Sequence, residues 1–203
     1  MIITISGMPG SGKSTVAKIL ARRLRMKRYY VGMMRRKMAR EKGMTLAEFN
    51  KLGEKEDWTD RTVDEYQKKL GEKEDNFVIE GRTSFFLIPQ SVKVFLGVDM
   101  KVGAKRIFDE LKKGECGRNE GEFKTLKEAE KSVIERHTSD VRRYKKYYGV
   151  DITDRRQYDI IIDTTRLTPA QAVEKIIAEI KKLKKRIRLF KPSRGLSGSC
   201  PLP

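Results

Sequence analysis

Ile2-Ile3-Thr4-Ile5-Ser6-Gly7-Met8-Pro9-Gly10-Ser11-Gly12-Lys13-Ser14, at the start of the chain, decides the fold class. Residues 2–6 are rich in β-branched side chains and apolar on both faces, which is typical of a buried parallel strand. Residues 7–14 fit the pattern G-x-x-x-x-G-K-[ST] at every fixed position. The apolar residues that follow recur at the spacing of one helix face. A strand, a glycine-rich loop and a helix in this order predict a phosphate-binding loop.

The chemistry of phosphate binding explains the spacing of this loop. Its glycines let the backbone curl, so that successive N–H groups point inward at phosphate oxygens. Lys13 then meets the β- and γ-phosphates, and the Ser14 hydroxyl ligates Mg²⁺. The positive end of the following helix points at the same anion. The sequence therefore predicts a nucleoside triphosphate held by Gly7, Met8, Pro9, Gly10, Ser11, Gly12, Lys13, Ser14 and Thr15.

Further strands and helices alternate along the chain. Apolar runs predict strands at residues 28–31, 76–80, 92–98 and 158–163. Helix N-termini are indicated by capping residues that precede apolar periodic segments, namely Thr45, Asp57, Asp99, Thr125 and Thr168. This alternation predicts an α/β fold with a doubly wound parallel sheet of about five strands.

Composition excludes several classes of protein. Among the 203 residues, 38% are hydrophobic and 36% are charged, and no apolar run approaches the roughly 20 residues that a membrane helix needs. The N-terminus lacks the charged region and cleavage site of a signal peptide. Two cysteines and one histidine argue against a disulfide scaffold or a zinc site. We therefore expect a cytoplasmic protein that contacts no membrane.

Positive charge is concentrated at the C-terminal end. The net charge is +18, and residues 181–203 carry eight basic residues and no acidic one. The preceding 180 residues still have a balance of +10, which favours anionic partners. We expect a single catalytic domain over residues 1–188. A basic Gly/Ser/Pro-rich tail follows at 189–203 and is expected to lack regular structure.

Three arginine-bearing elements favour a small-molecule kinase among phosphate-loop proteins. The first is Gly32-Met33-Met34-Arg35-Arg36, and the second is Glu80-Gly81-Arg82 at the end of a predicted strand. The third is the pair Arg136 and Arg143 on a predicted long helix. Seven residues turn a helix by about 700° and advance it by about 10 Å, so the two side chains lie on nearly one face. Such a pair can span two phosphoryl groups and supply positive charge during their transfer.

At these residues the sequence resembles the nucleoside monophosphate kinases, and most closely the short cytidylate kinases typical of archaea. Residues 7–15, Gly32 and Arg36, 80–82, Arg136 and Arg143, and 158–165 follow the order and spacing of that family. The resemblance covers residues 1 to about 180. It implies an adenylate-kinase-like fold in which residues 33–72 form an inserted acceptor-binding subdomain. It also implies that the loop at 113–124 belongs to a lid over ATP.

The same resemblance implies roles for individual residues. ATP and Mg²⁺ are the expected cofactors, with Ser14 and Glu80 managing the metal directly or through water. Arg36 and Arg82, with Gly81, are expected to hold the acceptor monophosphate. The expected catalytic residues are Lys13, Arg136 and Arg143, which neutralise charge on the transferring group. The reaction so implied moves the γ-phosphoryl group of ATP to CMP or dCMP, giving CDP or dCDP and ADP, in a monomeric enzyme.

Two alternatives follow from other features of the sequence. The family often has Ser two residues before the glycine aligned with Gly32 and an acidic residue one after it, where this chain has Tyr30 and Met33. These departures favour a kinase for another monophosphate, AMP or UMP. The net charge of +18 suggests instead an ATPase associated with nucleic acid, although the basic tail has only Phe190 as an aromatic residue for base stacking.

Overall fold

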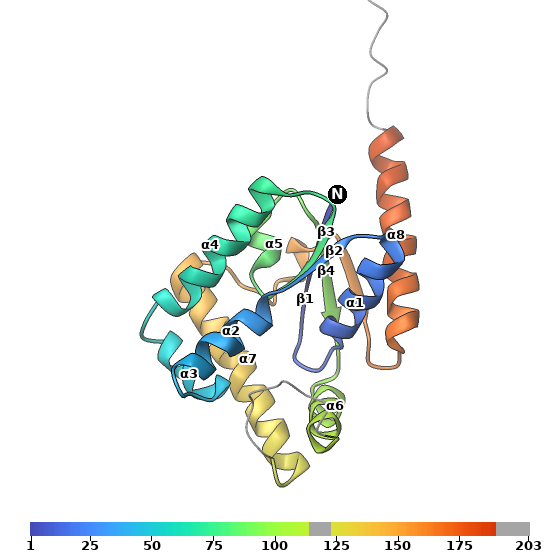
Figure 1. Ribbon diagram of the computed structural model, residues 1–203. Coiled ribbons are helices and arrows are strands. Elements are labelled where there is room, and N and C mark those ends of the chain that lie inside the picture. The colour runs from blue at the N-terminus through green and yellow to red at the C-terminus, as the bar shows by residue number, and fades with distance from the viewer. Residues whose placement is uncertain (114–122, 190–203) are drawn as a thin grey trace, which may run out of the picture.

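Five parallel strands form the central layer of the molecule, which we describe from a computed structural model over residues 1–113 and 123–189 (Figure 1). They are β1 (Ile2–Gly7), β2 (Lys27–Tyr30), β3 (Phe77–Glu80), β4 (Val92–Gly97) and β5 (Ile160–Asp163). Their order across the sheet is β2-β3-β1-β4-β5, and every neighbouring pair is parallel. The predicted α/β class and the five-stranded parallel sheet are thereby confirmed.

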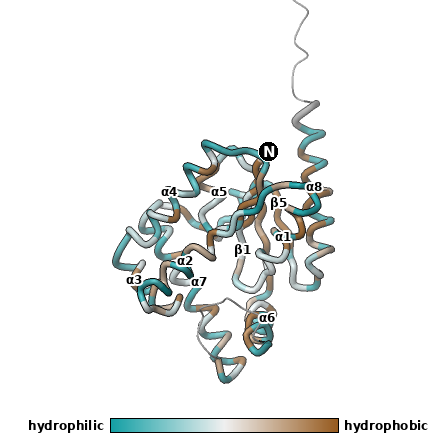
Figure 2. The backbone as a smooth tube through the Cα atoms, in the orientation of Figure 1, coloured by the Kyte–Doolittle hydropathy of each residue, from teal (hydrophilic) through white to brown (hydrophobic). Residues whose placement is uncertain are grey.

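Helices cover both faces of the sheet (Figure 1). On one face, α1 (Lys13–Leu24) and α8 (Pro169–Leu189) lie side by side and bury Val16, Leu20 and Ile176 against β1 and β4. Figure 2 shows the hydrophobic residues gathered on the strands and on the sides of these helices that face them. Each fully buried aliphatic side chain stabilises the fold by about 1.5–3 kcal/mol.

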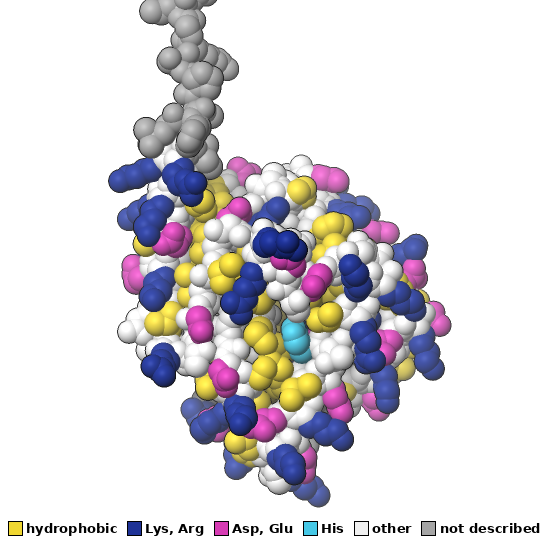
Figure 3. All heavy atoms as spheres, turned by 180° about the vertical axis from the view of Figure 1, so that it is seen from behind, with side chains coloured by type: hydrophobic (Ala, Val, Ile, Leu, Met, Phe, Trp, Pro, Cys, Tyr) yellow, Lys and Arg dark blue, Asp and Glu magenta, His cyan; other side chains and the backbone are white. Residues whose placement is uncertain are grey.

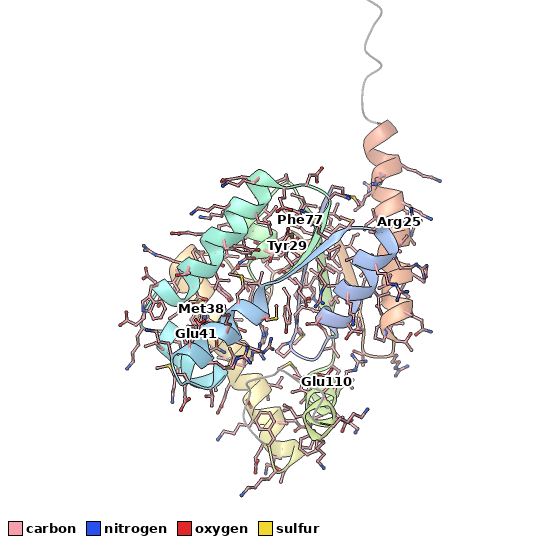
Figure 4. The ribbon with its side chains drawn as sticks, in the orientation of Figure 1. Arg25, Tyr29, Met38, Glu41, Phe77 and Glu110 are labelled. Atoms are coloured by element: carbon pink, nitrogen blue, oxygen red, sulfur yellow. The ribbon has the colours of Figure 1, made fainter. Side chains whose placement is uncertain are left out.

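On the other face lie α4 (Trp58–Lys73), the single turn α5 (Ser84–Leu87) and α7 (Leu126–Tyr148). Val63 and Leu70 of α4 pack with Ile88 and with Phe77 of β3. The rings of Tyr29 and Phe77, labelled in Figure 4, meet edge to face with their centroids 5.3 Å apart. This packing anchors α4 and the segment that contains it to the sheet.

Three helices separate β2 from β3 in the sequence: α2 (Val31–Glu41), α3 (Leu46–Gly53) and α4. Thr45 caps α3 through the predicted capping box with Glu48. The predicted cap at Asp57 is wrong, because its side chain makes no capping hydrogen bond and pairs instead with Arg61 one turn along. These helices include residues 33–72, the segment expected to bind the acceptor.

The remaining elements are α6 (Met100–Lys112) and the short 3₁₀ helix η1 (Arg155–Gln157). The predicted caps Asp99, Thr125 and Thr168 each accept a backbone N–H from the first turn of α6, α7 and α8. Most of the expected lid at 113–124 and of the tail at 189–203 lies outside the described residues. No helix among those described is long and apolar enough to cross a membrane.

Candidate active site

The glycine-rich loop leaves the carboxyl end of β1 and leads directly into α1. In open α/β sheets, ligands bind at this edge, where neighbouring connections diverge to opposite sides. Gly10 has a φ of +72°, and a Cβ there would lie 2.2 Å from the backbone oxygen of Gly103. Only glycine therefore allows the loop to pack against the backbone of α6.

Lys13 is the first residue of α1, and its Nζ donates to the carbonyl oxygens of Gly7 and Met8 at 2.9 and 2.6 Å. The ammonium group is thus folded back over the loop whose N–H groups are expected to surround phosphate. The first turn of α1 carries no acidic side chain. Its positive end is consequently available to an anion.

A cavity of about 580 Å³ extends from this loop to the helices inserted between β2 and β3. The loop contributes residues 9–15 to the cavity wall, whereas Gly7 and Met8 form the turn behind it. Beyond the loop, the wall contains five more residues singled out from the sequence: Arg36, Glu80, Gly81, Arg82 and Arg136. Residues far apart in the chain therefore meet around one cavity.

At the end of the cavity nearest α6, Arg106 connects three segments. Its guanidinium donates to the carbonyl oxygens of Thr164 and Thr165 at 2.8 and 3.2 Å, and to that of Gly10 at 3.4 Å. The Thr164 hydroxyl donates in turn to the Ser11 carbonyl at 3.1 Å. The connection between β5 and α8 is thus fastened to the phosphate loop, and Arg106 lines the cavity beside it.

Ser14 and Glu80 both line the cavity, which fits the expected magnesium chemistry. Glu80 is 3% exposed, and its Oε1 accepts a hydrogen bond from Arg28 Nε at 2.9 Å. No group of three or more potential metal-ligating side chains occurs among the described residues. Mg²⁺ needs no such group, because it keeps several waters and binds through one or two protein oxygens plus substrate phosphates.

Arg36 is 6% exposed and is positioned by its own helix and by Tyr30. Its NH1 donates to the Tyr30 hydroxyl and, at 3.2 Å, to the Gly32 carbonyl. Its guanidinium carbon also lies 5.6 Å from the centre of the Tyr30 ring. Met33 is 57% exposed and does not contribute to the cavity wall. Tyr30 therefore supports the arginine that is expected to hold the acceptor, and Met33 lies away from the cavity.

Two buried aspartates link three arginines in and behind the cavity wall. Asp60 of α4 accepts from Arg35 NH1 at 2.7 Å and from Arg143 NH1 at 2.7 and 2.9 Å. Asp140 of α7 pairs with Arg143 and, at 2.7 Å, with Arg82. We call these five residues the ion-pair network. It joins α2, α4 and α7 to the segment that follows β3.

The electrostatics of the network keep the Asp140 carboxylate charged. Burial alone would raise the pKa of Asp140, but the guanidinium groups of Arg82, Arg143 and Arg136 lower this pKa to about 2. Burial lowers the pKa of Arg82, and Asp140 partly opposes that effect. The network has one more positive than negative charge, so it adds positive potential to the acceptor side of the cavity.

The structure separates the two arginines of α7. Arg136 lines the cavity as the spacing predicted, whereas Arg143 is 1% exposed and is absent from the cavity wall. The two side chains do share a helix face, but α3 and α4 pack over the part that carries Arg143. The Tyr147 hydroxyl, for example, donates to the Gly53 carbonyl of α3 at 2.7 Å.

Sequence reasoning missed Asp60 and Asp64, which both line the cavity. Each side chain is at least 95% buried on α4. A signal for them exists in retrospect, because residues 60, 63, 64, 67 and 70 recur at the spacing of one buried helix face. Charged residues within an apolar face are expected to be paired or functional.

Comparison with known proteins agrees with this arrangement. A sequence model of the Cytidylate kinase-like family matches residues 2–166. The cytidylate kinase of Archaeoglobus fulgidus is 38% identical over 187 residues, which cover 91% of this chain and 98% of that protein. The cytidylate kinase of Pyrococcus furiosus is 38% identical over 170 residues, which cover 83% of this chain and 82% of that protein.

Solved structures share the fold at low sequence identity. The shikimate kinase from Aquifex aeolicus superimposes with a TM-score of 0.55 and 22% identity, over 91% of this chain and 98% of that one. The shikimate kinase from Acinetobacter baumannii superimposes with a TM-score of 0.59 and 16% identity, over 90% of this chain and 94% of that one. These similarities show that the chain shares its fold with these proteins.

Proposed function

The chain belongs to the cytidylate kinase-like family, and from that membership we propose that it transfers the γ-phosphoryl group of ATP to CMP or dCMP. The products are ADP and the corresponding diphosphate. The observation that carries this proposal is the single cavity shared by the phosphate loop and by Arg36, Arg82 and Arg136. A donor and an acceptor bound there have their phosphates in the same enclosed space.

On the donor side, Lys13 releases the loop carbonyls and binds the β- and γ-phosphates together with the loop N–H groups. Ser14 and Glu80 are the residues that would hold Mg²⁺, directly and through water respectively. When bound, the metal would neutralise negative charge on the phosphates of ATP. Arg28 keeps the Glu80 carboxylate in place through its hydrogen bond to Oε1.

On the acceptor side, Arg36 and Arg82 hold the monophosphate beside Gly81. An oxygen of that phosphate attacks the γ-phosphorus, the bond to the ADP oxygen breaks, and the electron pair leaves with ADP. No general base is required, because the acceptor phosphate is mostly ionised at pH 7. Arg136 contacts the group in transfer. Arg143 acts from behind the wall by holding Asp60 and Asp140.

The same observations bear on partners and location. One chain supplies the phosphate loop together with Arg36, Arg82 and Arg136 to the same cavity, so we propose that the monomer is active. We place it in the cytoplasm, where its nucleotide substrates are made and used. Figure 3 shows Lys and Arg side chains scattered over one face rather than gathered in a single patch, which gives little support to a nucleic-acid partner.

The choice of acceptor base is tested by a screen of the common monophosphates with detection of ADP. We expect kcat/KM for CMP or dCMP to exceed that for AMP, UMP and GMP by at least about tenfold. A kcat/KM for AMP or UMP tenfold above that for CMP contradicts the proposed acceptor. ATP turnover stimulated by RNA without a monophosphate contradicts the proposed class of enzyme.

A further inference from the structure

The acceptor end of the cavity contains a carboxylate, that of Asp64, for which the phosphate chemistry has no use. Asp64 projects from α4 and lines the cavity, although its side chain is 95% buried. It stands apart from the ion-pair network, because no arginine forms an ion pair with it in the described chain. A buried carboxylate without a cationic partner is costly, so its retention in a cavity wall calls for a reason.

One oxygen of this carboxylate is firmly held. Oδ1 accepts hydrogen bonds from Gln67 Nε2 at 2.8 Å and from the Thr83 hydroxyl at 2.9 Å. Gln67 is oriented in turn by Ser84, whose hydroxyl donates to Gln67 Oε1 at 2.6 Å. Because Thr83 and Ser84 directly follow Arg82, the carboxylate has a fixed position relative to the acceptor-phosphate arginine.

The other oxygen, Oδ2, is buried and has no hydrogen-bond partner among the described residues. The Tyr148 hydroxyl approaches the carboxylate from α7 and favours its charged form, but it does not complete a hydrogen bond to Oδ2. The other charged neighbours are Asp60 and Arg35, which oppose each other in their effect on Asp64. The χ2 torsion of aspartate is soft, so a small rotation presents this oxygen to a ligand.

Apolar side chains adjoin this carboxylate in the cavity wall. Val63 precedes Asp64 on α4, and Leu46 comes from the start of α3; both line the cavity and are at most 4% exposed. Apolar surfaces with a few placed polar groups suit a flat heterocycle whose edge carries hydrogen-bonding atoms. A carboxylate oxygen accepts only, so the matching edge must donate.

We propose that Asp64 is the residue that reads the acceptor base, by accepting a hydrogen bond from the exocyclic 4-amino group of cytosine through Oδ2. This inference rests on the proposed function, and it names the group that distinguishes cytosine from uracil. Carboxylates pair with the cytosine amino group, whereas uracil places a carbonyl oxygen at the same position. Two acceptors would then face each other in the buried site, and UMP is rejected.

The test compares the wild-type enzyme with Asp64→Asn and with Glu65→Gln as a matched control. Glu65 is the exposed neighbour on α4, so its variant removes one carboxylate charge from the same helix without touching the cavity. Three acceptors are used: CMP, UMP and the 2-pyrimidinone nucleotide, which lacks the 4-amino group. Thermal unfolding of each variant is measured in parallel.

We expect Asp64→Asn to lower kcat/KM for CMP by about tenfold or more, mainly by raising the KM for CMP. The kcat/KM for UMP should fall by less than about threefold. When the 2-pyrimidinone nucleotide replaces CMP, kcat/KM should fall by a similar factor for the wild type and hardly at all for Asp64→Asn. The control should match the wild type. Equal losses for CMP and UMP, no change in either, or an unfolded Asp64→Asn protein would overturn the proposal. A wild type that does not prefer CMP to UMP overturns the proposed function itself.

Discussion

At the scale of single residues, Arg82 is the proposed link between acceptor binding and the ion-pair network. Its guanidinium lines the cavity and lies 2.7 Å from Asp140. Arg82→Ala removes a charged hydrogen-bond donor to the acceptor phosphate, a contact worth about 1.5–3 kcal/mol. We therefore expect the KM for CMP to rise at least about tenfold while the KM for ATP changes little. Steady-state kinetics with each substrate varied in turn measure both values.

The fold should tolerate this change, because Asp140 keeps its ion pair with Arg143. Arg142→Ala is the matched control, since that arginine is 65% exposed on the same helix as Asp140. An equal rise in KM for ATP and for CMP would show that Arg82 does not belong to the acceptor side.

Asp64 provides a prediction about stability. Burial raises its pKa to about 6 in the folded protein, from a model-peptide value of about 3.9. A carboxyl group whose pKa is raised in the folded state destabilises the fold once it ionises. The free energy of unfolding that Asp64 removes therefore increases as the pH rises from about 4 to 6, and it is constant above about pH 6. The Asp64→Asn variant cannot ionise there. The free energy of unfolding of Asp64→Asn, relative to that of the wild type, should therefore increase by about 2 kcal/mol between pH 4.5 and pH 7.

Chemical denaturation at the two pH values measures this difference. If the variant and the wild type differ in free energy of unfolding by the same amount at pH 4.5 and pH 7, the Asp64 carboxylate has an ordinary pKa in the folded state.

Which site residues could be predicted from the sequence depended on whether a local pattern existed. Lys13 and Ser14 belong to a fixed loop pattern, and Arg82 follows a strand end, so their place at the sheet edge follows from topology alone. The difference between Arg136 and Arg143 depends on which helices pack over α7, which spacing along α7 does not reveal. Asp60 and Asp64 belong to no short motif, because their partners lie on other elements.

At the scale of elements, α3 meets the ion-pair network at Gly53, its last residue. A Cβ at this position would lie 2.8 Å from Thr59 Oγ1, 2.9 Å from Arg35 NH2 and 3.3 Å from Arg143 NH1. Gly53→Ala should therefore lower the free energy of unfolding by about 1–3 kcal/mol, although alanine in a helix is normally favoured over glycine. It should also raise the KM for CMP more than that for ATP.

Lys51→Ala, on the exposed side of α3, is the control for helix propensity. Thermal unfolding and acceptor kinetics measure the two effects. If Gly53→Ala is as stable as the wild type, the close approach of α3 to the network is not required.

The elements themselves were largely predictable. Each of the five predicted strand segments became a strand. The clearest signals came from β1 and β3, whose residues are buried on both faces of the sheet. Capping residues at Thr45, Asp99, Thr125 and Thr168 marked helix starts correctly. Asp57 also marks a helix start, that of α4, but it makes no capping hydrogen bond, because its backbone is already helical and its carboxylate pairs with Arg61. The order of strands across the sheet depends on long-range pairing and could not be read from local patterns.

At the scale of the whole molecule, the described residues that line the cavity all fall between Pro9 and Ala172. The helix α8 continues to Leu189 and packs on α1 and β5 through its first turns. Deleting residues 190–203 should therefore leave kcat and both KM values within about twofold. It should weaken binding to a polyanion at low salt, because two basic residues of the C-terminal cluster are lost. A large loss of kinase activity would contradict this division of the chain.

We propose that one cavity brings ATP and CMP together for direct phosphoryl transfer. The most direct test follows the label from [γ-³²P]ATP in the presence of CMP, for the wild type, for Lys13→Ala and for the exposed α1 control Lys18→Ala. We expect the wild type and Lys18→Ala to place the label in CDP, one for each ADP formed. Lys13→Ala should retain less than about a tenth of the wild-type rate. Label appearing in inorganic phosphate rather than CDP, or an unimpaired Lys13→Ala enzyme, would contradict the account.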